Sequence, residues 1–176
     1  MTTYYKAVRP DGTSFHDPSF RWVPESGTVE GVVVTHPDPH DASPSGWLSV
    51  ATVPTDCTGM RWPCRLLEVE PVEGHPVTAP LENLPNKRAA SAWLVVRELP
   101  ATDAFGPHGV EVAAIIDRAR RLTGDEARRL TAAARDATWD AACGTLTRDL
   151  ITTEQYDTLM GPWRLVISHS EVPADE

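Results

Sequence analysis

The chain has 176 residues, of which 41% are hydrophobic and 23% charged, and its formal net charge is -9. A globular protein of this size can bury a core without help from disulfides or a structural metal. Acidic residues outnumber basic ones by 13 to 8 up to His108 and by 12 to 8 after it, which disfavours nucleic acid and anionic membranes as partners.

The sequence also indicates a compartment. It has no apolar run of the roughly 18 residues that a spanning helix needs, and its first residues lack the apolar segment of a secretory signal. The three cysteines, Cys57, Cys64 and Cys143, are an odd number and do not suggest a disulfide framework. We therefore expect a cytoplasmic protein with reduced thiols.

Prolines divide the chain into two parts, because 14 of the 16 lie before His108. Proline restricts strands to short runs and sheet edges, so residues 1–108 should form short strands joined by loops. Runs bounded by Pro, Gly, Asp or Ser predict these strands near Tyr4–Arg9, Ser14–Val23, Thr28–Thr35, Gly46–Val53 and Pro63–Val72.

One helix is expected near the end of this first part, at Lys87–Glu98. Asn86 is its predicted N-cap. The residues that form its apolar stripe recur at three- and four-residue spacing, as on one face of a helix, and are Ala89, Ala92, Trp93 and Val96.

The second part, residues 109–176, has the composition and periodicity of helices. The first helix should begin at Gly109, and the capping-box sequence Thr123-Gly124-Asp125-Glu126 should begin a second that runs to about Cys143. A similar box at Thr152 predicts a short last helix that stops at Gly161-Pro162.

These elements predict an α+β protein. A small, mostly antiparallel sheet or partial barrel should come first, followed by a helical C-terminal part packed on it. We expect the two parts to form one structural domain.

Three stretches carry a resemblance: YKAVRPDGTSF near the start, WLSVATVPTDCTGMRWPCRLLEVEP in the middle, and AAARDATWDAACGTLTRDLITTEQYDTLMGPW from Ala132 to Trp163. Together they resemble an uncharacterised family of actinobacterial and actinophage proteins over nearly the whole chain. The resemblance implies an accessory protein with a β-rich front and a helical back. It brings no known activity and no catalytic residues.

The densest group of potential metal ligands is His36-Pro-Asp38-Pro-His40-Asp41. Imidazoles and carboxylates of this kind can bind zinc and similar ions. However, the intervening prolines prevent the helix that would place His36 and His40 on one face. We therefore favour a solvated loop and expect no metal.

Two cysteines lie seven positions apart, at Cys57 and Cys64, which is not the spacing of a zinc knuckle or a redox motif. Cys57 lies at a predicted turn, where a thiol could act as a nucleophile, but no neighbouring base is evident. Free cysteines are more often buried apolar residues. We favour that interpretation here and read Cys143 as a packing residue.

One enzymatic hypothesis is based on the order of four residues. ADP-ribosyltransferases of the Arg-Ser-Glu type use a first-strand arginine, a serine strand and a Glu-x-Glu pair to bind NAD, and the chain is similar in order, with Arg9, Ser49, Glu68 and Glu70. The Ser-Thr-Ser sequence of that family is absent, and Lys6 occupies the place of its arginine. The alternative is an ordinary strand in which Glu68 and Glu70 point outward.

Six tryptophans are many for this length, and such rings fill cores or anchor interfaces. Trp62 and Trp163 are the two expected at the surface, where they would bind a protein partner. The common nucleotide, hydrolase and zincin motifs are absent. We therefore expect a non-catalytic interaction or regulatory protein without a cofactor, with the NAD-dependent transferase as the alternative.

Overall fold

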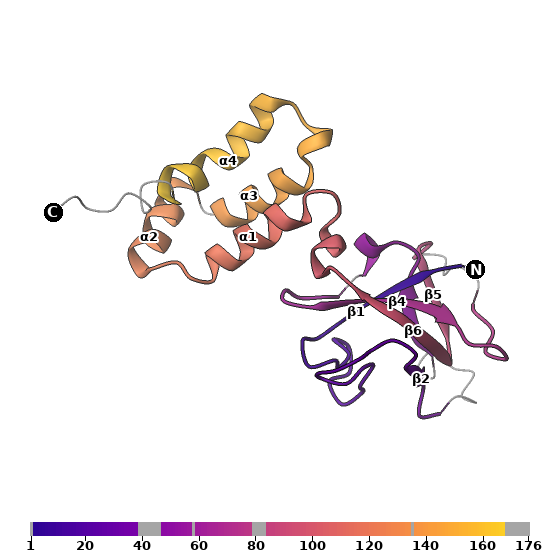
Figure 1. Ribbon diagram of the computed structural model, residues 1–176. Coiled ribbons are helices and arrows are strands. Elements are labelled where there is room, and N and C mark those ends of the chain that lie inside the picture. Colours follow the sequence, from indigo (N-terminus) through magenta and orange to yellow (C-terminus); the bar gives the residue numbers. More distant parts are fainter. Residues whose placement is uncertain (1, 39–46, 58, 79–83, 135, 168–176) are drawn as a thin grey trace. The chain divides into compact units, whose positions relative to one another are not determined.

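The computed structural model describes residues 2–38, 47–57, 59–78, 84–134 and 136–167. The chain divides into two compact units, a β unit at Met1–Gly106 and a helical unit at Pro107–Glu176. This arrangement confirms the α+β class (Figure 1). In the described ranges, no helix is long and apolar enough to cross a membrane.

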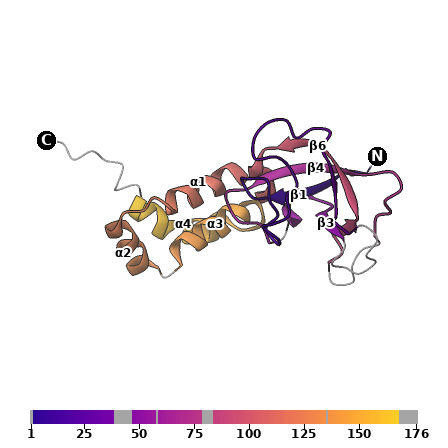
Figure 2. The ribbon, with the colours of Figure 1, turned by 90° about the horizontal axis from the view of Figure 1, so that it is seen from below.

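The β unit is built on one antiparallel sheet of six strands in the order β2-β6-β4-β1-β3-β5. Strand β1 lies inside the sheet, between β4 and β3. Strand β4 is labelled near β1 in Figure 1, and both β4 and β3 are labelled in Figure 2. The strand bounds are β1 Tyr4–Val8, β2 Val33–Thr35, β3 Leu48–Ala51, β4 Arg65–Pro71, β5 Lys87–Ala90 and β6 Ala92–Leu99.

The chain joins the two halves of this open sheet at Ser91. This single residue separates β5 from β6, although β5 pairs with β3 and β6 pairs with β4 and β2. Strand β5 lies at one edge of the sheet and β6 lies near the other edge. Because only one residue joins them, the sheet must curve so that these two strands come close together. The indole Nε1 of Trp93 on β6 donates to the carbonyl of Leu48 on β3, at 2.8 Å.

The main core of the β unit lies on the concave face. It contains Tyr4 and Val8 of β1, and it includes Trp22 and Trp93, which are 2% and 0% exposed. Tyr4 and Trp93 meet edge to face with ring centroids 5.1 Å apart. A smaller cluster of Ala7, Ala51, Cys57, Leu66 and Ala104 covers part of the other face.

The helix predicted at Lys87–Glu98 is wrong, because this segment forms β5 and β6. Strand β6 is hydrogen-bonded to a neighbour on each side, which satisfies the backbone groups that a helix would pair internally. It also contains Trp93, Val95 and Val96, whose aromatic and branched side chains suit a pleated surface. The three- and four-residue spacing therefore did not decide the structure.

The strand predicted at Ser14–Val23 is also wrong. This segment forms turns and bends, with a single bridge between Thr13 and Arg21. The hydroxyl oxygen of Ser14 accepts from the backbone of His16 at 3.2 Å, and the carboxylate of Asp17 accepts from the backbone of Ser19 at 2.9 Å. Such local bonds compete with a strand ladder.

The helical unit contains four α-helices, α1 at Gly109–Ala119, α2 at Gly124–Ala133, α3 at Ala137–Leu146 and α4 at Thr153–Ile167. The long helix expected from Thr123 to Cys143 is therefore two helices, and Ala134 between them has an extended backbone. The predicted capping boxes at Thr123 and Thr152 both form.

The predicted stop at Gly161-Pro162 is wrong, because α4 continues through both residues. A residue before proline is disfavoured in a helix mainly through its Cβ, and Gly161 has none. Continuation places Trp163 and Val166 in the core of the helical unit, together with Met160, Ile115 of α1 and Ala141 of α3.

Candidate ligand site around Lys6

The four residues of the transferase hypothesis do not form one site. Glu68 is ion-paired with Arg97 on β6 at 2.7 Å. Arg9 follows β1, and its Nε donates to the carbonyl of Ser14 at 3.2 Å. In the β1–β4 ladder Val8 pairs with Arg65 and Tyr4 with Val69, so Arg9 and Glu70 lie at opposite ends, ~20 Å apart along the strands. Ser49, on β3, alone lies beside a cavity.

The predicted metal ligands are only partly described. His40 and Asp41 lie outside the described residues. The ring of His36 stacks on Phe20 with centroids 6.4 Å apart, and its Nδ1 accepts from the backbone of Asp38 at 3.1 Å. The part of the chain that the structure covers holds no group of three or more His, Cys, Asp or Glu residues placed to bind a metal.

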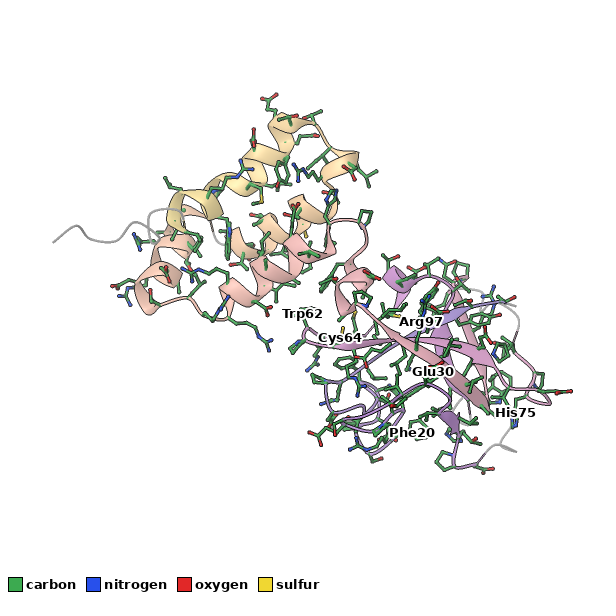
Figure 3. The ribbon with its side chains drawn as sticks, viewed as in Figure 1. Phe20, Glu30, Trp62, Cys64, His75 and Arg97 are labelled. Atoms are coloured by element: carbon green, nitrogen blue, oxygen red, sulfur yellow. The ribbon has the colours of Figure 1, made fainter. Side chains whose placement is uncertain are left out.

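The two tryptophans expected at the surface do not form an exposed patch. Trp62, labelled in Figure 3, precedes β4 and is half-buried. Its ring centroid lies 5.5 Å from that of Phe105. Trp163 is only 6% exposed, which corrects the prediction of a surface position; it is buried because α4 does not end before it. The tryptophans that are exposed are Trp47 on the β unit and Trp139 on α3.

The cysteines are poor nucleophiles. Cys57 and Cys64 are buried, and burial raises the pKa of both thiols, that of Cys64 to about 11. A thiol with a raised pKa has little of the reactive thiolate at neutral pH. The interpretation of Cys57 as a buried apolar residue fits this position better than a catalytic one.

An unexpected site surrounds Lys6, in the middle of β1. Its Nζ donates to the carbonyl of Ser49 at 3.0 Å and lies 4.7 Å from the ring centroid of Trp22. Burial, and then the neighbouring charge of Lys87, lower the pKa of this amine from 10.5 to about 8. No carboxylate among the described residues forms an ion pair with Lys6.

Two cavities, of about 440 and 430 Å³, meet at this lysine. The residues that line both are Lys6, Ser14, His16 and Ser49. Strands β1 and β3 are paired only at Tyr5 and Ala51, so Lys6 bonds across to β3 where the ladder has no further pair. Each cavity has the volume of an ordinary small-molecule site.

The two cavities differ in their other walls. The first is lined by Tyr5, Phe15, Cys57 and Lys87 among others, and it has no acidic lining residue among those described. The second is lined by aromatic rings, those of Phe20, Trp22, Trp47 and His36, together with one acidic residue, Asp17. Asp17 accepts from the backbone and the hydroxyl of Ser19, and these bonds lower the pKa of its carboxyl.

This arrangement suits an anionic ligand. A desolvated ammonium group without a carboxylate partner gains from an incoming negative charge, because charge attraction is strong where water is excluded. Lys87 adds a second positive charge to the first cavity, and its own pKa is lowered mainly by burial. A half-buried lysine with a lowered pKa beside a cavity is a candidate for a functional site.

Sequence reasoning missed Lys6 as a binding residue, although one signal was present. The chain has 14 arginines and only Lys6 and Lys87 as lysines, and both lysines reach the same cavity. Lysine is a compact cation whose pKa changes readily on burial, whereas arginine stays charged and is planar. Two lysines in an arginine-rich chain therefore indicate positions that need the compact ammonium group of lysine rather than the planar guanidinium group of arginine.

No family model, curated protein or solved structure matches this chain.

Proposed function

We propose that this protein is a non-catalytic binding protein whose β unit captures a small anionic ligand at Lys6. The observation that carries the proposal is the half-buried side chain of Lys6, whose ammonium group donates to a backbone carbonyl and faces two cavities without an ion pair among the described residues. Such a group is stabilised when a carboxylate or phosphate enters.

Binding is favoured over transfer chemistry by the positions of the other reactive groups. Arg9 and Glu70 lie at opposite ends of the β1–β4 ladder, so the NAD-dependent alternative lacks its expected cleft. Burial raises the pKa of Cys57, the thiol nearest Lys6, and keeps it protonated. These features support a regulatory or interaction role rather than a catalytic one.

Thermal unfolding with simple anions tests this proposal. We expect acetate, benzoate or inorganic phosphate at millimolar concentration to raise the melting midpoint, by about 5–10 °C where the anion reaches one hundred times its Kd. Lys6→Met should abolish the rise, and Arg61→Met, which removes an exposed cation of the same unit, should preserve it.

Two results would contradict the proposal. One is the absence of a midpoint shift with every anion, and the other is an equal shift in Lys6→Met. NAD provides a further arm of the same experiment, because a rise with NAD that survives in Lys6→Met would favour the transferase alternative.

We further propose that the binding protein acts as an accessory factor with a protein partner, in the cytoplasm of an actinobacterium or its phage. The resemblance in the sequence supports the origin, and Trp139, which is 70% exposed on α3, supports the partner. Large exposed aromatic residues are frequent anchors of protein interfaces. Loss of the complex in Trp139→Ala, with an unchanged melting midpoint, is the expected result.

A further inference from the structure

We infer that the ligand of the Lys6 site is an aromatic monocarboxylate, whose acid group meets Lys6 and whose ring lies in the cavity lined by Phe20, Trp22 and Trp47. This inference rests on the proposed function, because it names the ligand class of the same site. The proposed function specifies only the negative charge of the ligand, whereas this inference also specifies an aromatic ring as its uncharged part.

The first argument is the chemistry of the cavity walls. Rings from three separate segments line the second cavity, Trp22 and Phe20 from the loops after β1, His36 from the end of β2, and Trp47 from the start of β3. They are already organised against one another. Phe20 meets Trp22 edge to face with centroids 6.3 Å apart, and it stacks on His36 with an interplanar angle of 26°.

The second argument is the distance between the charge and the rings. The Nζ of Lys6 lies 4.7 Å from the ring centroid of Trp22. An acid group bonded to Nζ therefore lies near Trp22, whose own ring is buried, and the more accessible rings of Phe20 and Trp47 line the same cavity. A ligand with its ring attached close to the acid can use both the ammonium group and these rings. Aromatic pairs attract one another beyond what their buried area contributes, which a saturated ring does not obtain.

The third argument is the number of charges. Lys6 is the one lysine or arginine among the described residues that line this cavity, and Asp17 lines it too. A ligand with several negative charges would meet the carboxylate of Asp17 as well as the ammonium of Lys6. A single carboxylate avoids this repulsion, which favours a monoacid over a polyphosphate.

The experiment is a calorimetric titration of the whole protein with four probes: benzoate, cyclohexanecarboxylate, benzyl alcohol and inorganic phosphate. We expect benzoate to bind at least fivefold more tightly than cyclohexanecarboxylate, which has a similar size and the same charge but no aromatic ring. Benzyl alcohol, which keeps the ring and loses the charge, should show no measurable binding. Phosphate should bind more weakly than benzoate.

Variants identify the groups responsible. Lys6→Met should abolish binding of both acids. Trp47→Leu, at an exposed position that should tolerate the change, should bring the affinity for benzoate to within about twofold of that for cyclohexanecarboxylate. Trp139→Leu on the helical unit is the matched control and should change neither affinity.

A proton measurement adds a readout that a purely structural role of Lys6 would not move. A carboxylate beside Lys6 raises the pKa of its ammonium, so at pH 8.5 benzoate binding should take up a proton. The uptake is measured from the binding enthalpy in two buffers of different ionisation enthalpy. It should disappear in Lys6→Met.

The possible failures can be told apart. If cyclohexanecarboxylate or phosphate binds as tightly as benzoate, and the binding needs Lys6, the aromatic ligand class is wrong while the anion site stands. If none of the acids binds, or Lys6→Met binds them unchanged, the anion site itself is wrong and the inference falls with it.

Discussion

Lys6 illustrates how a single residue can be unfavourable for the fold and useful for binding. Its side chain is half-buried, and its ammonium group contacts one carbonyl and one aromatic face. Desolvation of a charge disfavours the charged form, which is the main cause of its lowered pKa. A bound anion would offset that desolvation. The pKa of Lys6 should therefore change more on ligand binding than that of any other group in the site.

The first prediction concerns the pH dependence of stability. The folded-state pKa of Lys6, about 8, lies below its ordinary value of 10.5, so between these pH values the unfolded chain binds more protons than the folded one. The stability contribution of Lys6 should therefore be least favourable below pH 8 and should rise between pH 8 and 10.5. In the parent protein this rise should amount to about 1–3 kcal/mol in the free energy of unfolding between pH 7.5 and 10, and Lys6→Met should lack it.

Urea unfolding of both proteins at the two pH values measures this effect. The pKa values of Lys87, Cys57 and Asp17, which line the same two cavities, also depart from their ordinary values. Comparison of the variant with the parent at each pH largely cancels their contributions. An equal difference in unfolding free energy at pH 7.5 and pH 10 would contradict the lowered pKa.

The second prediction compares two tryptophans of the helical unit. Trp163 is 6% exposed within the core, and Trp139 is 70% exposed on α3. Trp163→Ala should lower the free energy of unfolding by about 3–5 kcal/mol, because it leaves a large cavity. Trp139→Ala should change it by less than about 1 kcal/mol. Chemical denaturation followed by circular dichroism measures both, and equal effects would contradict the burial described above.

At the scale of elements, the start of α2 depends on one buried carboxylate. Glu126 is 4% exposed, its Oε2 accepts from the backbone of Thr123 at 2.8 Å, and its Oε1 lies 2.6 Å from a guanidinium nitrogen of Arg118 on α1. It thus completes the capping box and joins α2 to α1. The sequence pattern Thr-x-x-Glu predicted the box but not the ion pair, because Arg118 belongs to the preceding helix.

The third prediction follows from this carboxylate. Glu126→Ala should destabilise the helical unit by about 2–4 kcal/mol, since it removes the cap and leaves Arg118 without this partner. Asp125→Ala is the matched control, one position earlier and exposed, and should have a small effect. Thermal melting of the two variants gives the comparison, and similar losses would show that the box and the ion pair contribute little.

Some strands could be predicted from sequence patterns alone, and others could not. The strands near Tyr4–Arg9 and Pro63–Val72 were predicted because Pro, Gly, Asp or Ser bound each run, and they form β1 and β4. Strand β6 was missed because its partners β4 and β2 come from distant parts of the chain and outweigh a local helical spacing. The break at Ala134 has no proline or glycine to mark it.

The candidate site was harder to predict than the fold for the same reason. Lys6, Trp22 and Trp47 lie on different segments, and their approach depends on how β1 and β3 diverge and on loops without periodicity. The four transferase residues matched a known order in the sequence, but order does not fix which end of a ladder a residue occupies. The register of β1 with β4 decides that Arg9 and Glu70 stay apart.

At the scale of the whole molecule, the two units differ in how far apart in the sequence their contacting residues lie. In the helical unit, α3 packs on α4 and on α1, all close in sequence. In the β unit, Tyr5 of β1 pairs with Glu68 of β4 and with Ala51 of β3. Contacts between distant residues slow folding, because long loops must close before the contacts form.

The fourth prediction is that the helical unit folds before the β unit. Refolding followed by pulsed hydrogen exchange should protect amides of α3 and α4 at least tenfold sooner than amides of β1 and β4. Trp163→Ala, which removes a core side chain of the helical unit, should slow or weaken the early protection. Simultaneous protection of both sets of amides would show that the two units fold as one.

The interior position of β1 also has a mechanical consequence. Strand β1 holds β4 on one side and β3 on the other, so force applied through the residues just before Tyr4 acts on the middle of the sheet rather than on an edge. Extraction of this one strand would break the pairing with both neighbours and remove Lys6 from both cavities at once, while Ser91 would still join β5 to β6. A motor that pulls on this segment would therefore destroy the ligand site and divide the sheet in a single event.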